Sequence, residues 1–311
     1  GQTVGHAIVV DFSKYMRHIQ EVNLEEGWVR TQPGIVLDEL NHHLARYSVQ
    51  FAPDPSTSNR GNVGGALGNN SCGAHSIMWG KTVDNVHSLD VILANGKATT
   101  MGPIDSAGMT SKLHSEGLEG AIYQTLSTIG QSNRQAISDR YPKIQRRVSG
   151  YNLDELVNDG TFNMARFVIG SEGTLVTITE AKLKVVAVPK LKGLVVLHCK
   201  ELIESMEATV AALDMNPSAV ELIGSMIIQQ AKSNLTYSRI TNFINGDPEA
   251  LLLIEVYADS DQELRSKLDK IKERMEKGNW GYSTLILTKP EDQARVWNVR
   301  KAGLGLMMNV P

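Results

Sequence analysis

One stretch of twenty residues, 61–80, constrains the fold of this 311-residue chain more than any other. It contains six glycines and no lysine, arginine, aspartate or glutamate. Glycine adopts backbone conformations that other residues avoid, and it lets another group approach the main chain closely. Without charged side chains, such a stretch can bind an anion only through backbone N–H groups, amides and hydroxyls. The sequence therefore predicts either a diphosphate site built from neutral groups or a tightly packed glycine-rich turn.

The spacing of these glycines excludes two common nucleotide motifs. The glycines at 61, 64, 65 and 68 give GxxGGxxG rather than GxGxxG, and no predicted strand leads directly into them, which disfavours a Rossmann site. No GxxxxGK followed by Ser or Thr occurs, which excludes a nucleoside-triphosphate P-loop. A second glycine-containing segment, 170–173, lies between two apolar runs. It is either a simple turn or a buried crossing where a flat ligand contacts the backbone.

The composition is that of a globular protein, with 41% hydrophobic and 21% charged residues, and the length suggests two domains. A formal net charge of -3 provides no basic excess for binding nucleic acid. The longest apolar runs, such as 250–254, are far shorter than the ~20 residues of a membrane span. Cys72 and Cys199 form no CxxC pair, so a cytoplasmic, reducing setting is expected, with peripheral contact to a membrane left open.

The first half of the chain alternates short apolar runs with turn residues. Asn95-Gly96, between apolar runs at 89–94 and 98–101, predicts a β-hairpin. Leu37, Leu40 and Leu44 mark one face of a short helix. The other predicted elements are strands at 7–10, 28–31, 166–169 and 175–188, a loop at 51–59 and a helix between 111 and 129.

From residue 190 onward, the predicted order of elements is β-α-β-β-α-β, which matches a ferredoxin-like unit. Strands are expected at 194–197, 219–223, 250–256 and 284–287, with a polar, irregular stretch between the second strand and Pro248. A capping box, Ser260 to Glu263, opens the second helix, and a last helix starts at Glu291. The two inner helices are expected to bury Leu202, Met206, Val210 and Leu213, and Leu264, Leu268, Ile271 and Met275.

Several ordered motifs resemble the FAD-binding domain of the vanillyl-alcohol oxidase/PCMH superfamily. They are Pro-Asp-Pro-Ser-Thr-Ser at 53–58, the glycine-rich stretch at 64–74, Trp79-Gly80, and Gly-Ser-Glu-Gly-Thr-Leu at 170–175. Within the superfamily, the sequence is most similar to the FAD-linked D-2-hydroxy-acid dehydrogenases. The segments 146–156 and 296–303 resemble the long members, in which an iron–sulfur module follows the flavin enzyme on one chain.

The resemblance implies an α+β fold: a PCMH-type FAD-binding domain at residues 1–189 and a ferredoxin-like cap domain at 190–311. It also implies a fragment, because only the tail of the first diphosphate loop is present, at residues 1–5. The general base, a divalent metal and the iron–sulfur clusters are expected beyond Pro311, so no catalytic or metal-binding residue is assigned. Whether the chain alone binds FAD tightly or turns over stays open.

The resemblance also assigns site residues, with the cap domain over the isoalloxazine and Arg300 on the substrate carboxylate. The residues implied to line the diphosphate and ribityl region are Pro53, Asp54, Pro55, Ser56, Thr57, Ser58 and Asn59. Those implied to wrap the flavin and pyrophosphate are Gly64, Gly65, Gly68, Asn69, Asn70, Ser71, Cys72 and Gly73. Those implied to contact the adenosine end through backbone groups are Glu172, Gly173, Thr174 and Ile178.

Three residue types leave alternatives open. Arg300 is either a carboxylate ligand or a solvated arginine on an amphipathic helix. None of the eight histidines pairs at HxxxH or HxH spacing, which argues against a metal site. His75 either faces the flavin or makes a structural hydrogen bond. Cys72 does not match the position at which some relatives attach FAD, so non-covalent FAD is expected.

The implied reaction is FAD-dependent oxidation of a D-2-hydroxy acid, of the lactate, glycolate or 2-hydroxyglutarate type, to the 2-oxo acid. A base would remove the hydroxyl proton, a hydride would pass from C2 to flavin N5, and the electrons would leave to an iron–sulfur module or a quinone. Three alternatives remain: an oxidase that uses O₂, a catalytically silent flavin scaffold, and a binding module for a protein or RNA. The strands at 194–197 and 250–256 lack the aromatic and basic pattern of RNA-binding strands.

Overall fold

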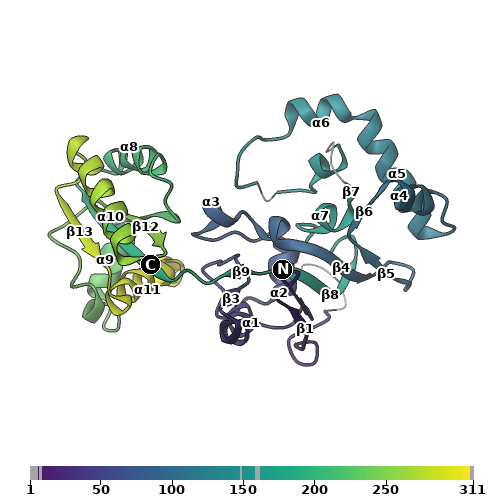
Figure 1. Cartoon of the computed structure of the whole chain (residues 1–311), viewed down its shortest axis with the longest axis horizontal. Coiled ribbons are helices and arrows are strands. Elements are labelled where there is room, and N and C mark those ends of the chain that lie inside the picture. The colour runs from purple at the N-terminus through teal and green to yellow at the C-terminus, as the bar shows by residue number, and fades with distance from the viewer. Residues whose placement is uncertain (1–5, 7–8, 148, 158–161, 309–311) are drawn as a thin grey trace. The chain divides into compact units, whose positions relative to one another are not determined.

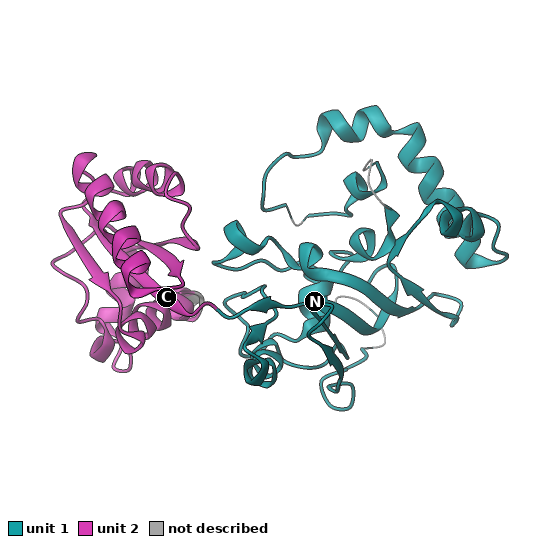
Figure 2. Ribbon diagram, in the orientation of Figure 1, with its two compact units in different colours: residues 1–188 teal, residues 189–311 magenta. Residues whose placement is uncertain are grey.

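The computed structural model describes residues 6, 9–147, 149–157 and 162–308. The chain divides into two compact units, Gly1–Val188 and Pro189–Pro311, drawn in teal and magenta in Figure 2. Both units combine helices with antiparallel sheets, as the element labels in Figure 1 indicate. This arrangement confirms the predicted α+β class.

Unit 1 is organised around a five-stranded antiparallel sheet with the order β1-β2-β8-β4-β5. Its strands are β1 (Ile19–Asn23), β2 (Trp28–Thr31), β4 (Val86–Ile92), β5 (Ala98–Met101) and β8 (Thr177–Lys184). Two short antiparallel pairs join β3 (Val49–Gln50) to β9 (Val186–Ala187) and β6 (Pro103–Ile104) to β7 (Phe162–Asn163). The hairpin at Asn95-Gly96 is confirmed, because Gly96 adopts a φ of 81° between β4 and β5.

Helices and 3₁₀ turns complete unit 1, and most of them share one apolar core with this sheet. They are α1 (Leu37–Leu44), η1 (Ala45–Tyr47), α2 (Val63–Asn69), α3 (Ser76–Trp79), η2 (Thr82–Asn85), α4 (Ser106–Leu113), α5 (Leu118–Ser132), α6 (Arg134–Arg140), η3 (Leu153–Leu156) and α7 (Met164–Val168). As predicted, α1 buries Leu37, Leu40 and Leu44. The single helix expected between 111 and 129 is divided in two, because Gly117 adopts a φ of 79° between α4 and α5.

Two predicted strands of unit 1 are wrong. Residues 166–169 fall on α7 and the residue after it, and the Asn163 side chain caps this helix by accepting a hydrogen bond from the Ala165 N–H at 3.0 Å. A short, fully buried apolar run has no period, so the sequence could not separate a helix from a strand here. Val9 and Val10 are 65% and 63% exposed and form no strand. The other half of that predicted strand, residues 7 and 8, lies outside the described residues.

Unit 2 is built on a four-stranded antiparallel sheet with the order β11-β12-β10-β13, the arrangement of a ferredoxin-like unit. Its strands are β10 (Leu191–Cys199), β11 (Ala219–Gly224), β12 (Ala250–Ala258) and β13 (Ser283–Leu287). Each contains the strand predicted from the sequence. The central strands β10 and β12 pair along their whole length, from Leu191↔Ala258 to Cys199↔Ala250.

Helices cover both faces of this sheet, so its central strands carry apolar side chains on both sides. The helices are α8 (Leu202–Leu213), α9 (Ser225–Ser233), η4 (Ser238–Ile240), α10 (Asp261–Lys277) and α11 (Pro290–Met308). α8 and α10 share a core with Val195 and Leu197, whereas α9 and α11 share a core with Leu194 and Val196. α9 lies in the stretch that was expected to be irregular. Its sequence signal is weak because only Ile228 and Ala231 are buried.

Of the two helices that share a core with Val195 and Leu197, α10 buries the side predicted from the sequence and α8 does not. α10 buries its predicted stripe, Leu264, Leu268, Ile271 and Met275. α8 has the expected position in the chain but buries small residues instead: Ser205, Ala208, Ala211 and Ala212. Its predicted stripe is between 41% and 68% exposed at Leu202, Met206, Val210 and Leu213. Small side chains let α8 pack closely against the interior, and the sequence stripe alone did not reveal this.

Candidate functional site

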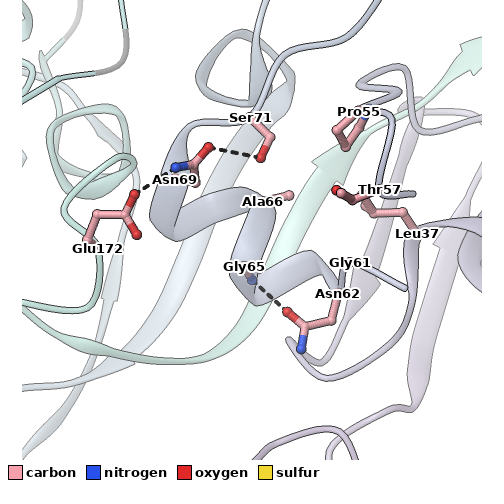
Figure 3. Close-up of a pocket in the computed structure, with 10 residues that line it drawn as sticks. All are labelled: Leu37, Pro55, Thr57, Gly61, Asn62, Gly65, Ala66, Asn69, Ser71 and Glu172. Atoms are coloured by element: carbon pink, nitrogen blue, oxygen red, sulfur yellow. Dashed lines mark hydrogen bonds between the residues drawn. The ribbon is translucent and has the colours of Figure 1, made fainter. Parts of the chain in front are cut away.

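A pocket of about 520 Å³ lies in unit 1, beside α2 and the turn at residues 170–173 (Figure 3). It is lined by the start of α1, the loop before α2, one side of α2 and the turn. The lining residues are Leu37, Pro55, Thr57, Gly61, Asn62, Gly65, Ala66, Asn69, Ser71 and Glu172. The volume lies within the roughly 300–1,000 Å³ typical of small-molecule sites.

The glycine-rich stretch forms α2, and neighbouring groups fix the first turn of this helix. The Asn62 side chain accepts a hydrogen bond from the Gly65 N–H at 2.7 Å, and the Gly64 N–H donates to the Pro33 carbonyl at 2.7 Å. A Cβ at Gly64 would lie 2.8 Å from the Cβ of Pro33, so only glycine permits this close packing. The stretch is therefore a packed turn on one side and a pocket wall on the other.

The end of α2 is bonded to the second glycine-containing segment, more than one hundred residues later. The Glu172 N–H donates to the Gly68 carbonyl, and the Gly170 N–H donates to the Leu67 carbonyl, both at 2.9 Å. The Asn69 amide also donates to Glu172 Oε1 at 2.8 Å (Figure 3). These three bonds join the two segments into one wall of the pocket.

Glu172 has an unusual backbone conformation for a glutamate. Its φ is 52°, in the left-handed region, and it stands between Gly170 and Gly173, which also have positive φ. For a non-glycine residue this conformation costs on the order of 1 kcal/mol. The bonds to Gly68 and Asn69 hold it there, and they place its carboxylate on the pocket.

The polar groups on the pocket are neutral apart from this carboxylate. The hydroxyls of Thr57 and Ser71 and the amides of Asn62 and Asn69 can donate or accept hydrogen bonds. Of the described residues that line the pocket, none is lysine, arginine or histidine. Such a surface can bind a ligand by hydrogen bonds from neutral donors, with a single anionic acceptor at the Glu172 end.

The structure brings only part of the expected cofactor residues to this pocket. Those on its lining are Pro55, Thr57, Gly65, Asn69, Ser71 and Glu172. Those outside the lining are Pro53, Asp54, Ser56, Ser58, Asn59, Gly64, Gly68, Asn70, Cys72, Gly73, Gly173, Thr174 and Ile178.

Asp54 contacts the glycine-rich stretch through its carboxylate. Its Oδ2 lies 2.6 Å from Nδ1 of His75, and its Oδ1 accepts a hydrogen bond from the His75 N–H at 3.2 Å. A Cβ at Gly73 would overlap with both the carboxylate and the backbone of Asp54. Asp54 therefore fastens the loop before α2 to the end of the stretch. His75 makes the structural hydrogen bond that was one of its two predicted roles.

Three other expected residues lie outside the lining and make structural contacts. Asn70 is 1% exposed, and its Oδ1 accepts a hydrogen bond from the Val83 N–H at 3.0 Å. The Thr174 hydroxyl donates to the Ser171 carbonyl at 2.6 Å. Ile178 pairs with Val91 in the sheet.

Sequence reasoning missed four lining residues: Leu37, Gly61, Asn62 and Ala66. Asn62 had a usable signal, because asparagine before an apolar residue is a preferred helix N-cap. Gly61 stands within the glycine-rich stretch and Ala66 within α2. Leu37 had no sequence signal for a place in the pocket, because it belongs to a different helix and reaches the pocket only through the packing of α1.

Arg300 lies in unit 2 on α11, and its side chain contacts Glu221 of β11. Its Nε and Nη2 contact Oε2 of Glu221 at 2.8 Å and 2.6 Å. The side chain of Arg300 is 32% exposed, and that of Glu221 is 10% exposed. The guanidinium is therefore anchored to a carboxylate of its own unit, a contact that neither expected role of Arg300 included.

The two cysteines are not bonded to each other. Cys72 and Cys199 are free thiols. Burial, and to a smaller extent Glu204, raises the pKa of the Cys199 thiol to about 12, so this thiol stays protonated. Among the described residues, no three metal-ligating side chains come together. In the same part of the chain, no helix has both the length and the hydrophobicity of a membrane span.

Comparison with known families finds two matches. Residues 1–102 match the family described as "FAD binding domain", and residues 188–310 match "FAD linked oxidases, C-terminal domain". The chain is therefore similar to these two domain families, in the order that the sequence motifs indicated.

Particular relatives narrow the likeness further. The chain is 31% identical over 319 residues to D-2-hydroxyglutarate dehydrogenase of Pseudomonas putida, a match that covers 100% of this chain and 32% of the relative. It is 24% identical over 301 residues to the mitochondrial D-lactate dehydrogenase (cytochrome) of Arabidopsis thaliana, covering 96% of this chain and 42% of the relative. The chain thus spans about a third of the length of the D-2-hydroxyglutarate dehydrogenases that it matches.

A solved structure shares the fold. Alkyldihydroxyacetonephosphate synthase superposes with a TM-score of 0.59 at 18% sequence identity, covering 96% of this chain and 46% of that protein. At this level of identity the likeness concerns the fold alone.

Proposed function

We propose that this chain binds FAD non-covalently at the pocket beside α2, and that the whole protein oxidises a D-2-hydroxy acid to the 2-oxo acid. In this proposal the FAD-binding domain covers residues 1–189, and the substrate domain covers residues 190–311. The observation that carries the proposal is the bonding of Glu172 to Gly68 and Asn69, which makes one pocket wall from the two motifs of the resemblance.

The chemistry of the pocket fits part of an FAD molecule. A diphosphate accepts hydrogen bonds, and the hydroxyls of Thr57 and Ser71 are neutral donors that suit it. The Glu172 carboxylate repels phosphate oxygens, so its end of the pocket suits the hydroxyl groups of a ribose or ribityl chain. When bound, FAD supplies the acceptor for a hydride from C2 of the substrate. The protein contributes binding and orientation.

The substrate class follows from the relatives. Hydroxyglutarate and lactate, named in D-2-hydroxyglutarate dehydrogenase and D-lactate dehydrogenase, both carry a hydroxyl group beside a carboxylate. A guanidinium can bind a carboxylate through two parallel N–H groups. We assign this role to Arg300, because its side chain combines a fixed position with partial exposure. The electrons are proposed to leave to an iron–sulfur module or a quinone.

The test is anaerobic reduction of the whole FAD-containing protein by candidate acids. We expect D-lactate, glycolate or D-2-hydroxyglutarate to bleach the flavin absorbance, and the L-enantiomers of the chiral acids to leave it unchanged. The reduced flavin should then reoxidise faster with a dye acceptor than with air. An unbleached flavin with every D-acid would contradict the proposed reaction, and fast reoxidation in air would favour an O₂-using oxidase.

A further inference from the structure

Arg300 is bound to a carboxylate of its own unit. The two contacts with Glu221 go to a single oxygen, Oε2, from Nε at 2.8 Å and from Nη2 at 2.6 Å. We infer that Glu221 is a positioning residue that aims Arg300 at the substrate carboxylate. The inference rests on the proposed role of Arg300, and it adds a residue that neither the motifs nor the resemblance indicated.

The shape of the guanidinium explains how one carboxylate can aim it at another. The group is planar and has five N–H donors in a fixed fork. Nε–H and one N–H of Nη2 lie on the same edge, and Glu221 takes that edge. The Nη1 end of the fork points along a different edge. A substrate carboxylate can accept two parallel bonds there without displacing Glu221.

Glu221 is itself held firmly. It lies within β11 opposite Leu253 of β12, so the pairing of the two strands sets the direction of its side chain. Its side chain is only 10% exposed. A carboxylate with so little exposure on a paired strand moves little, and it therefore restricts the rotamers of the long arginine side chain. Such restriction before binding reduces the entropy lost when the ligand binds.

A second link joins the same helix to the same sheet and provides a control. Trp297, three residues before Arg300 on α11, donates from Nε1 to Oε2 of Glu255 at 3.1 Å. Residues three apart lie on the same side of a helix. Glu255 is 2% exposed and pairs with Ala219 of β11, two residue pairs along from the Glu221–Leu253 pair. Removing the bond between Trp297 and Glu255 should loosen α11 while leaving the contacts of Arg300 with Glu221 in place.

Positioning and competition predict opposite changes. If Glu221 only neutralised Arg300 and competed for its donors, removing Glu221 would strengthen binding of an acid. If Glu221 positions Arg300, removing it weakens binding, because the guanidinium then samples many rotamers. Glutamine at this position keeps an oxygen acceptor without the charge, so it should preserve most of the positioning.

The experiment measures binding of oxalate, a non-reacting dicarboxylate, to the whole FAD-containing protein by calorimetry, with thermal unfolding of each variant alongside. We expect the oxalate Kd to rise about 100-fold in Arg300→Ala, about 10-fold in Glu221→Ala and about threefold in Glu221→Gln. In the control Trp297→Phe the thermal midpoint should fall while the Kd stays within about twofold. If Glu221→Ala does not fold, the Glu221→Gln variant decides.

Each other outcome has a defined meaning. Unchanged or tighter oxalate binding in the Glu221 variants, with strong weakening in Arg300→Ala, overturns the inference and leaves the proposed function intact. A Trp297→Phe variant that weakens binding as much as Glu221→Ala also overturns it, because the effect then belongs to the placement of α11 as a whole. An Arg300→Ala variant with unchanged Kd instead removes Arg300 from the proposed function.

Discussion

The candidate cofactor pocket of unit 1 and the Arg300–Glu221 pair of unit 2 are built in different ways. The pocket is made from turns, a short glycine-rich helix and neutral side chains, and its walls are joined largely by backbone bonds such as Glu172 N–H to Gly68. The pair stands on a long helix and a paired strand, and its contacts are between charged groups.

This difference determines what each site can tolerate. A site made by the backbone depends on where the chain can pass, so a single added methyl group at a packed glycine can disrupt it. A site made by charges depends on the identity and orientation of a few side chains, and on the ions in solution. Four predictions follow from this contrast, from the largest expected effect to the smallest.

Arg300→Ala should lower kcat/KM for the preferred hydroxy acid by at least about 100-fold, because a bidentate, charge-assisted contact is lost. Arg300→Lys keeps the charge but not the planar fork, and it should lose about 10-fold. Steady-state kinetics with each acid measures both. Equal activity of the wild type and the lysine variant would show that charge alone suffices and that the fork geometry does not matter.

Gly73→Ala should destabilise unit 1 by about 3 kcal/mol, because the new methyl group overlaps with Asp54. The control is Gly224→Ala, at a glycine with no atom within 4 Å of the added Cβ. It should change the free energy of unfolding by less than about 0.5 kcal/mol. Chemical denaturation of both variants makes the comparison, and a Gly73→Ala variant as stable as the control would contradict the packed-backbone account.

Salt should separate the two sites. Raising NaCl from about 0.05 M to about 0.5 M shortens the screening length several-fold, so oxalate affinity should fall about threefold to fivefold. FAD held by neutral donors should lose less than about twofold over the same range. Calorimetric titration of each ligand at both salt concentrations is sufficient. A steeper salt dependence for FAD than for oxalate would reverse the contrast.

His198 makes the stability of unit 2 depend on pH. Burial lowers the pKa of this imidazole, although hydrogen bonds to the Phe243 and Ser283 carbonyls oppose the shift. Its pKa is therefore lower in the folded than in the unfolded state, and the unfolded chain binds the proton first. The contribution of neutral His198 to the free energy of unfolding should be complete above a pH of about 6.5, which is the pKa of histidine in the unfolded chain. This contribution should fall as the pH drops below that value. The decrease in thermal midpoint between pH 7.5 and pH 5 should be smaller in His198→Asn than in the wild type.

Elements with a clear local signal could be predicted from the sequence. The Asn95-Gly96 pair is typical of a β-hairpin, and the apolar stripe of α10 is typical of a helix. The structure contains both elements as predicted. The helix α7 and the buried side of α8 could not be read in this way. An apolar run without a period fits two structures, and alanines pack against an interior that the sequence does not display.

The sequence predicted the type of pocket, but not the contacts between distant residues that build the sites. The absence of charge at residues 61–80 pointed to neutral donors, and the pocket has them at Asn62 and Ser71. The link between Asn69 and Glu172 spans 103 residues, so only the resemblance to a family connected them. The bond between Arg300 and Glu221 had no signal, because a glutamate in a strand usually faces solvent.

Exchanging one neutral group of the pocket for a charged one tests the central claim most directly. Ser71→Asn and Ser71→Asp differ by one charge at nearly constant shape, and fluorescence titration gives the FAD dissociation constant of each. If neutral donors at this pocket hold the diphosphate, the asparagine variant should stay within about fivefold of the wild type, and the aspartate variant should bind about 100-fold more weakly. Equal FAD affinity in the two variants would place the cofactor elsewhere.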